Sequence, residues 1–265
     1  MKAFLSTFWA AFWAEFLKAK RSKVPLLTTA GFMILPAVTG LFMVILKDPE
    51  GAKEMGLISM KAQLTGGVAD WPALFEMLKM GTGIAGQILF SIIVAWVFGR
   101  EFADHTVKDL LALPTPRETI VAAKFLLVLV WTMAVTLLIF AAGYGIGLIV
   151  DIPGLSSHLT LASFWSSAQI GFLSFLLMPV VALIASAGRN YLPPLGWAFL
   201  AMALAQIAAV MGWGEWFPWA VPALLSEFSG PVEPLGLHSY LVVALVFVIG
   251  TVSTFLWWGR ADQAG

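Results

Sequence analysis

Six stretches of the chain carry no charged side chain and are long enough, or nearly long enough, to cross a lipid bilayer. A transmembrane helix needs about 20 mostly apolar residues to span a hydrocarbon core about 30 Å thick. The six stretches are residues 24–46, 82–98, 125–150, 168–187, 195–212 and 241–258. With 60% hydrophobic and 11% charged residues, the chain is too apolar for a water-soluble globule. The sequence therefore predicts an all-α polytopic membrane protein, with a single domain over residues 1–265.

The distribution of basic residues predicts the orientation of the spans. If the spans alternate in direction, 11 of the 15 Lys and Arg residues lie on the side that holds both termini, and 4 lie on the other. Short connections rich in Lys and Arg stay in the cytoplasm. We therefore expect both termini in the cytoplasm.

The same composition argues against several kinds of chemistry. Basic and acidic residues number 15 each, so the chain lacks the basic excess typical of nucleic-acid-binding proteins. It has no cysteine, and its three histidines lie in three connections on two sides of the membrane, so we predict no metal site and no catalytic residue. No Asp, Glu, Lys, Arg or His lies inside a predicted span, and no G-x-x-x-x-G-K-[ST] loop occurs. A transporter built in this way has to draw its energy from a partner.

The first 23 residues predict an interfacial helix. They place phenylalanine at every fourth position and end in basic residues: Phe4, Phe8, Phe12 and Phe16, then Lys18, Lys20, Arg21 and Lys23. Such a helix lies in the inner membrane surface, with its aromatic face in the acyl boundary and its basic end at anionic lipid headgroups. The alternative is a plain cytoplasmic extension of the first span.

The cytoplasmic connection after the second span is the most charged part of the chain, because residues 99–124 hold eight of its 30 charged residues. Residues 99–117 predict a short amphipathic helix, in which Asp104 and Lys108 form an i,i+4 pair. Such a helix is suited to docking on a soluble partner. An ordinary solvated helix is the alternative.

The outer connection at residues 213–238 is too apolar for a loop in water, and Pro218 and Pro222 interrupt it. Irregular backbone is tolerated at membrane depth where protein surrounds it. We therefore expect a half-helix that re-enters the outer leaflet.

Glycines predict close packing between helices, because they let two backbones approach each other. They stand at Gly81, Gly83 and Gly86 in one connection and span, and at Gly143 and Gly147 in another.

The order of residues after the second span resembles a family pattern. An acidic residue is followed by Thr-x-Lys-x-Leu-Leu-x-x-Pro-x-x-Arg and a later Lys, here Glu101, Thr106, Lys108, Leu110, Leu111, Pro114, Arg117 and Lys124. This resembles the permease subunits of type-2 ABC transporters, particularly the small six-span kind associated with bacitracin, lantibiotic and multidrug export. His105 stands where a Gly often precedes the Thr, and Pro116 stands where a Ser often precedes the Arg.

The resemblance implies the function and the partners. It implies a bacterial inner-membrane permease that acts with two copies of an ATP-binding subunit and a second permease copy. ATP and Mg²⁺ would bind to the partner and no cofactor to this chain. The expected cargo is amphipathic or hydrophobic: a peptide antibiotic, a drug or a lipid-like molecule, exported by alternating access.

The resemblance also implies functional residues. The helix at residues 99–117 would be the coupling helix that contacts the ATPase, through Glu101, Asp104, Thr106, Lys108, Asp109 and Arg117. Spans two and five of such permeases face the dimer centre, which makes Gln87, Ser91, Met202 and Gln206 the expected substrate path.

Two other classes stay open at this point. One is a membrane scaffold or immunity protein that transports nothing. The other is an intramembrane enzyme of lipid or prenyl chemistry, which would need Glu, His or Asp clustered at membrane depth.

Overall fold

The computed structural model describes residues 2–57, 67–112, 114–226 and 235–260, and for residues 2–5 and 111 the backbone alone. Over these residues all regular secondary structure is helical. Six helices are long and apolar enough to cross a membrane: α2 (Val24–Lys47), α4 (Trp71–Ala103), α6 (Arg117–Val150), α7 (Ser157–Ala187), α8 (Leu192–Val210) and α10 (Leu237–Arg260). The predicted all-α architecture with six candidate spans is confirmed.

Five further elements occupy the connections and the N-terminal segment. They are α1 (Lys2–Lys20), α3 (Pro49–Glu54), α5 (Val107–Leu111), the 3-10 helix η1 (Gly214–Trp216) and α9 (Val221–Leu224).

The spans extend beyond the charge-free stretches, most of all in α4, which begins eleven residues before the predicted start. The Asp70 carboxylate caps this helix by accepting a hydrogen bond from the Ala73 N–H at 2.8 Å. Its early turns contain Glu76 and Lys79, which neutralise each other across 2.5 Å. A search for uncharged runs misses these turns because it counts each charge separately. At 1.5 Å per residue the 33-residue helix is about 50 Å long, which exceeds the thickness of the hydrocarbon core.

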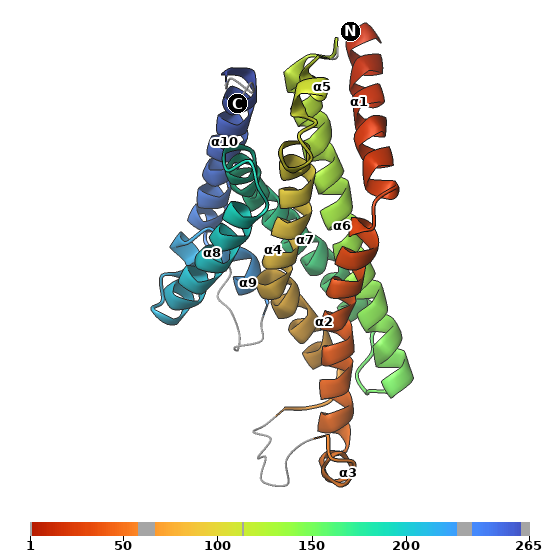
Figure 1. The fold of residues 1–265 in the computed structure, drawn as a ribbon. Helices are drawn as coiled ribbons and strands as arrows, with labels where there is room; N and C mark the ends of the chain where they lie inside the picture. Colours follow the sequence, from red (N-terminus) through yellow and green to blue (C-terminus); the bar gives the residue numbers. More distant parts are fainter. Residues whose placement is uncertain (1, 58–66, 113, 227–234, 261–265) are drawn as a thin grey trace.

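Hydrogen bonds between helix ends define one end of the bundle, which we name the α5 end. The Arg117 guanidinium at the start of α6 donates to the Trp258 carbonyl near the end of α10, at 3.3 Å. The Trp258 indole donates to the Ser186 hydroxyl at the end of α7, at 3.0 Å. Helix α1 and the end of α10 also lie there (Figure 1).

The opposite end, which we name the α3 end, is tied in the same way. The Lys47 ammonium at the end of α2 donates to the Val150 carbonyl at the end of α6, at 2.6 Å. The Trp71 N–H at the start of α4 donates to the Pro153 carbonyl at 3.1 Å. Consecutive spans therefore run in alternating directions, as the sequence predicts.

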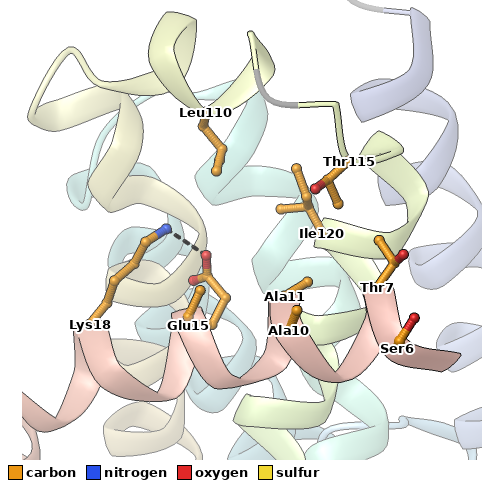
Figure 2. A pocket seen from close by; sticks show the side chains of 10 residues that line it. Ser6, Thr7, Ala10, Ala11, Glu15, Lys18, Leu110, Thr115 and Ile120 are labelled. Carbon is orange, nitrogen blue, oxygen red and sulfur yellow. Dashed lines mark hydrogen bonds and ion pairs between the residues drawn. The ribbon is translucent and has the colours of Figure 1, made fainter. Parts of the chain in front are cut away.

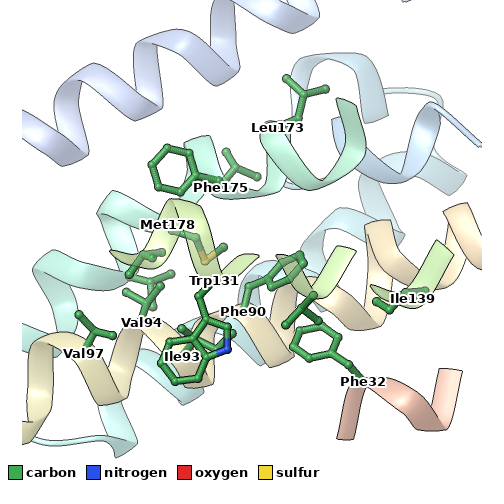
Figure 3. Packing of buried hydrophobic residues seen from close by; sticks show 14 of the residues in the cluster. Phe32, Phe90, Ile93, Val94, Val97, Trp131, Ile139, Leu173, Phe175 and Met178 are labelled. Atoms are coloured by element: carbon green, nitrogen blue, oxygen red, sulfur yellow. The ribbon is translucent and has the colours of Figure 1, made fainter. Parts of the chain in front are cut away.

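Helices α4 and α7 form the centre of the bundle, and the other spans pack around them (Figure 1). The core is rich in aromatic side chains (Figure 3). The rings of Phe32 on α2 and Phe90 on α4 lie 5.0 Å apart, and those of Phe175 on α7 and Phe247 on α10 lie 6.2 Å apart. Such ring pairs add to the dispersion contacts that hold helices together in lipid, where burial from water contributes little.

Four of the five predicted glycines are confirmed as close-packing positions: Gly81, Gly83, Gly143 and Gly147. A Cβ atom on Gly83 would lie 2.6 Å from the Cα atom of Ala223 in α9, which is backbone and cannot rotate away. Gly86 is different, because the nearest atom to its Cβ position is in Phe90 of the same helix, at an ordinary 3.5 Å.

The apolar outer connection folds back against α4. The Gln87 amide donates to the Trp219 carbonyl at 2.9 Å, sixteen residues or about 24 Å along α4 from its start. Val221 and Pro222 of α9 are buried. Residues 227–234 of the predicted re-entrant segment lie outside the described residues.

Helix α1 continues roughly along the line of α2 and packs beside the first half of α6 (Figure 1). The chain turns at residues 21–23, just before Pro25, which lacks the N–H needed inside a helix. Trp9 and Trp13 remain 57% exposed. The side chain of Phe4 lies outside the described part of the chain.

We predict that Gly250→Ala lowers the free energy of unfolding by about 1–3 kcal/mol, the range for overpacking a filled core. A Cβ atom there would lie 2.8 Å from the Val180 backbone nitrogen in α7. The matched control is Gly259→Ala on the same helix, where nothing lies within 4 Å. It should be neutral or stabilising by up to about 1 kcal/mol. Thermal unfolding of the detergent-solubilised protein checks this, and equal midpoints for the two variants would contradict it.

Candidate functional site

The charged connection at the α5 end consists of two helices rather than one. The predicted amphipathic helix at residues 99–117 is interrupted, because α4 ends at Ala103 and α5 begins only at Val107. Between them His105 adopts a left-handed backbone with φ 56°. Glycine adopts this conformation most readily, and His is one of the few other residues that tolerate it. The break also changes the predicted ion pair, since Asp104 pairs with Arg100 on α4 at 3.3 Å instead of with Lys108.

Helix α5 packs against the bundle with its apolar side and exposes its polar side on the protein surface. Val107 is buried, whereas Lys108 and Asp109 are exposed. Within the described residues neither of these two charges forms an ion pair. This short helix therefore offers one positive and one negative charge to a partner.

Five of the six predicted coupling residues are exposed at the α5 end: Asp104, Thr106, Lys108, Asp109 and Arg117. Glu101 is not among them, because it is only 4% exposed. It lies two residues before the end of α4 and faces the interior of the bundle. Any role of Glu101 in coupling has to act through its neighbours.

Glu101 belongs to a cluster of four charged side chains, which we name the ion-pair network: Glu15, Lys18, Glu101 and Lys124. The Lys124 ammonium is fully buried and uses all three of its hydrogens. It donates to Glu101 Oε1 at 2.8 Å, to Glu15 Oε2 at 3.0 Å and to the Val97 carbonyl at 2.7 Å.

Lys18 closes the network on the side of α1. Its ammonium donates to Glu15 Oε1 at 2.5 Å and to Glu101 Oε1 at 3.1 Å. Two carboxylates and two ammoniums thus cancel in a largely buried position. The network joins α1, α4 and α6, and it lies directly behind the turn that leads to α5.

Sequence reasoning missed this network. Glu15 and Lys124 are 109 positions apart, and the predicted span places Lys124 in the connection just before it. One signal was available, since Glu15 is the single acidic residue among the first 23 and stands in an aromatic helix. A lone carboxylate in such a place needs a cationic partner.

A groove of about 470 Å³ opens beside the network, between α1, α5 and the start of α6 (Figure 2). One wall is the small-residue face of α1, with Ala10, Ala11 and Ala14. Leu110 of α5 and Ile120 of α6 form the other wall, and Glu15 and Lys18 lie along its edge. The groove places the network within reach of anything that contacts α5.

The connection between α7 and α8 completes the α5 end. Its Tyr191 ring lies 3.4 Å from the Cβ position of Gly99 on α4. Partial burial, and then the Asp104 carboxylate, raise the pKa of the Tyr191 phenol. The hydroxyl is therefore neutral at physiological pH and adds no charge to this surface.

The structure brings part of the predicted substrate path together. Met202 and Gln206 line a cavity of about 190 Å³ between α4, α8 and α9, with Trp219. Gln87 and Ser91 do not line it. Ser91 donates to the Gln87 carbonyl at 2.8 Å, and the Gln87 amide nitrogen bonds to the Gly83 and Trp219 carbonyls, both at 2.9 Å. The bond from Gln87 to Trp219 holds α4 and the outer connection together, whereas Ser91 bonds within α4. The role of both residues in a substrate path stays a prediction.

In the parts of the chain that the structure describes, no three His, Asp or Glu side chains are grouped as metal ligands would be.

Comparison of the sequence with known proteins identifies the family of this chain. Residues 11–205 match the sequence model of the ABC-2 family transporter proteins, a range that holds the whole network and α5. The chain belongs to this family. The bacitracin transport permease protein BCRB of Bacillus licheniformis is 26% identical over 179 residues, which cover 68% of this chain and 86% of that protein. The ABC-2 permease is a membrane-spanning subunit, and membership of the family implies an ATP-binding partner.

We predict that Lys124→Met destabilises the permease by about 3–5 kcal/mol, the cost of leaving a buried charge without its partner. The carboxylates of Glu15 and Glu101 would then share one ammonium, that of Lys18, and one negative charge would stay unmatched. Amide hydrogen exchange in α1 should rise together with a fall in the unfolding midpoint, because α1 loses its main polar attachment to α6.

The control for this prediction is Lys108→Met, which removes an exposed lysine and should leave stability and exchange unchanged. Adding Glu101→Gln to Lys124→Met should recover part of the loss by removing one stranded carboxylate. Wild-type exchange in α1 of the Lys124→Met protein would contradict the assigned role of the network.

Proposed function

We propose that the chain is the permease subunit of an ATP-driven exporter for amphipathic or hydrophobic cargo, such as a peptide antibiotic, a drug or a lipid-like molecule. The observation that carries the proposal is the α5 turn. It exposes Lys108 and Asp109, which have no ion-pair partner among the described residues, and its Leu110 shares a groove with Glu15 and Lys18 of the buried network. The family and the printed name of the Bacillus licheniformis relative, bacitracin transport, support export of an antibiotic.

In this proposal the α5 turn is the coupling helix of the ATP-binding partner. Asp104, Thr106 and Arg117 flank the contact, and Glu101 transmits a displacement of the turn through Lys124 to α1 and α6. ATP and Mg²⁺ bind to the partner, of which two copies serve two permease copies. ATP then biases the bundle between two arrangements, as any coupled transition requires.

The second permease copy would meet the exposed apolar faces of the bundle. Large apolar side chains are exposed along α8 and α10: Phe199, Leu200, Leu204, Ile207, Leu245, Val248, Ile249 and Val252. We assign the α8 face to the second copy, because the cavity lined by Met202 and Gln206 would then open near the dimer centre. The α10 face would contact lipid.

The α5 end is proposed to lie in the cytoplasm, since most basic residues gather there. The exposed Trp9 and Trp13 of α1 would then lie in the inner-leaflet boundary, and the outer connection with α9 would re-enter the outer leaflet. Because the chain has no cysteine, single cysteines can report the orientation without background.

We predict that Lys108→Cys in intact cells resists a membrane-impermeant thiol reagent and reacts once the cells are opened. Lys53→Cys in α3 should react in intact cells, because α3 lies at the opposite end of the bundle (Figure 1). Labelling is read by the mass shift of the purified protein. The reverse pattern would overturn the orientation.

The function itself is tested with the permease and its ATP-binding subunit reconstituted in lipid vesicles, with bacitracin as the cargo probe. We predict ATP-dependent accumulation of bacitracin in vesicles whose α5 end faces outward. Lys108→Glu should reduce the ATPase activity stimulated by the permease at least tenfold, because like charges at an interface cost several kcal/mol and each 1.4 kcal/mol is about a factor of ten.

Lys53→Glu, at the other end of the bundle, is the matched charge reversal and should have no effect on ATPase activity. Stable assembly with an ATPase but no ATP-dependent movement of bacitracin or other amphipathic probes would favour the scaffold alternative. Wild-type coupling in Lys108→Glu would remove α5 from the interface.

A further inference from the structure

The elbow between α1 and α2 encloses a second groove, separate from the one beside α5. It has a volume of about 290 Å³ and is formed by the end of α1, the start of α2 and the flank of α6. Its lining is Phe16, Ala19, Lys20, Pro25, Leu127, Val130, Trp131 and Ala134. Lys20 is the one charged residue of this lining, and the walls are otherwise apolar. We name this cavity the elbow groove.

The shape of the elbow follows from the sequence. Helix α1 ends at Lys20, three residues form a turn, and α2 begins with Pro25 in its first turn. The Ser22 hydroxyl donates to the Ala19 carbonyl at 2.9 Å and fixes the turn. Helix α6 passes this turn without a break, and its residues 127–134 close the groove beside the end of α1 and the start of α2.

Three cations stand in residues 20–23, between α1 and α2, and one of them, Lys20, lines the elbow groove. Lys20, Arg21 and Lys23 are all exposed, and none of them forms an ion pair with another described residue. The nearest carboxylate along α1, that of Glu15, is already bound to Lys18 and Lys124. Lys20 in the lining, and Arg21 and Lys23 in the turn that follows it, thus have no ion-pair partner among the described residues.

This combination selects one class of occupant. An apolar groove excludes a free anion, which would gain nothing from the Leu127 and Ala134 walls, and the cations exclude a neutral hydrocarbon as the preferred ligand. A molecule with a negative headgroup and a long apolar chain fits both parts. Each Lys or Arg near an anionic membrane surface favours binding, and each buried methylene adds to it.

We propose that the elbow groove binds an anionic phospholipid, with its phosphate against Lys20, Arg21 and Lys23 and one acyl chain between Pro25 and α6. The site rests on the proposed orientation of the bundle but not on export or on an ATPase. The bound lipid braces α1 against α6 at a second point, about one turn beyond the network.

The test uses the reconstituted permease alone, without ATP or partner. Phosphatidylglycerol and phosphatidylcholine that carry the same photoreactive acyl chain are incorporated in turn, and crosslinked peptides are mapped by mass spectrometry. Phosphatidylglycerol should label residues 127–134 several times more strongly than phosphatidylcholine does. On the exposed α10 face, around Leu245 and Val252, the two lipids should label equally.

Two variants separate the headgroup from the chain. Lys20→Gln should lower the preference for phosphatidylglycerol about fivefold, as expected for one cation near an anionic headgroup. Ala134→Trp fills the groove and should abolish labelling there by both lipids, whereas Leu138→Trp, on the same helix outside the groove, should not.

Equal labelling of the groove by both lipids would overturn the proposal, as would undiminished labelling in Ala134→Trp. Labelling of the α10 face in every variant shows that the protein is folded and inserted. Because no ATPase is present, a failed export assay leaves this result standing, and a failed labelling result leaves export untouched.

Discussion

A fully buried ammonium, that of Lys124, imposes its requirements on the whole α5 end. Away from water its charge has to be matched, and each of its hydrogens needs an acceptor. Glu15 and Glu101 supply the charge, and the Val97 carbonyl supplies the third acceptor. To do so, α1 has to lie against α6, and α4 has to end with Glu101 facing inward. The position of α5 follows, because only a few residues separate it from Glu101.

Such a buried network adds little to the stability of the fold, but it determines how the helices are placed relative to one another. A well-packed apolar substitute for a buried ion pair is often as stable, whereas loss of one member is costly. The four charges of the network therefore fix where α1 lies and how far α4 extends. An aromatic helix with small residues on one face could otherwise pack against α6 in several registers. The carboxylate of Glu15 selects one of them.

The sequence predicts the spans well because lipid leaves few choices. A backbone in hydrocarbon has to satisfy its own hydrogen bonds, so a long uncharged run becomes a helix whatever its neighbours are. The same reasoning fails where charges cancel in pairs. Glu76 and Lys79 form an ion pair in the first turns of α4, and their charges make the predicted span begin too late. Lys124 has the same effect on α6, which begins before it.

The exposed part of the site could also be predicted, since Lys108 and Asp109 belong to a contiguous pattern. The buried part could not, because it depends on contacts between residues 109 positions apart. The break at His105 lies between these cases. Periodicity treats residues 99–117 as one helix, because it does not register the left-handed φ of His105, a conformation that glycine adopts most readily.

Helix α4 also carries a feature far from this end. At Gly83 its backbone touches the backbone of Ala223, with no side chain between them that could rotate or repack. The Gln87 amide reaches the same outer connection one turn further on. A rotation of α4 about its long axis would therefore move α9 with it. The cavity lined by Met202 and Gln206 would change shape in the same movement. Helix α4 would in this way connect the α5 end mechanically to the cavity near the other side of the membrane.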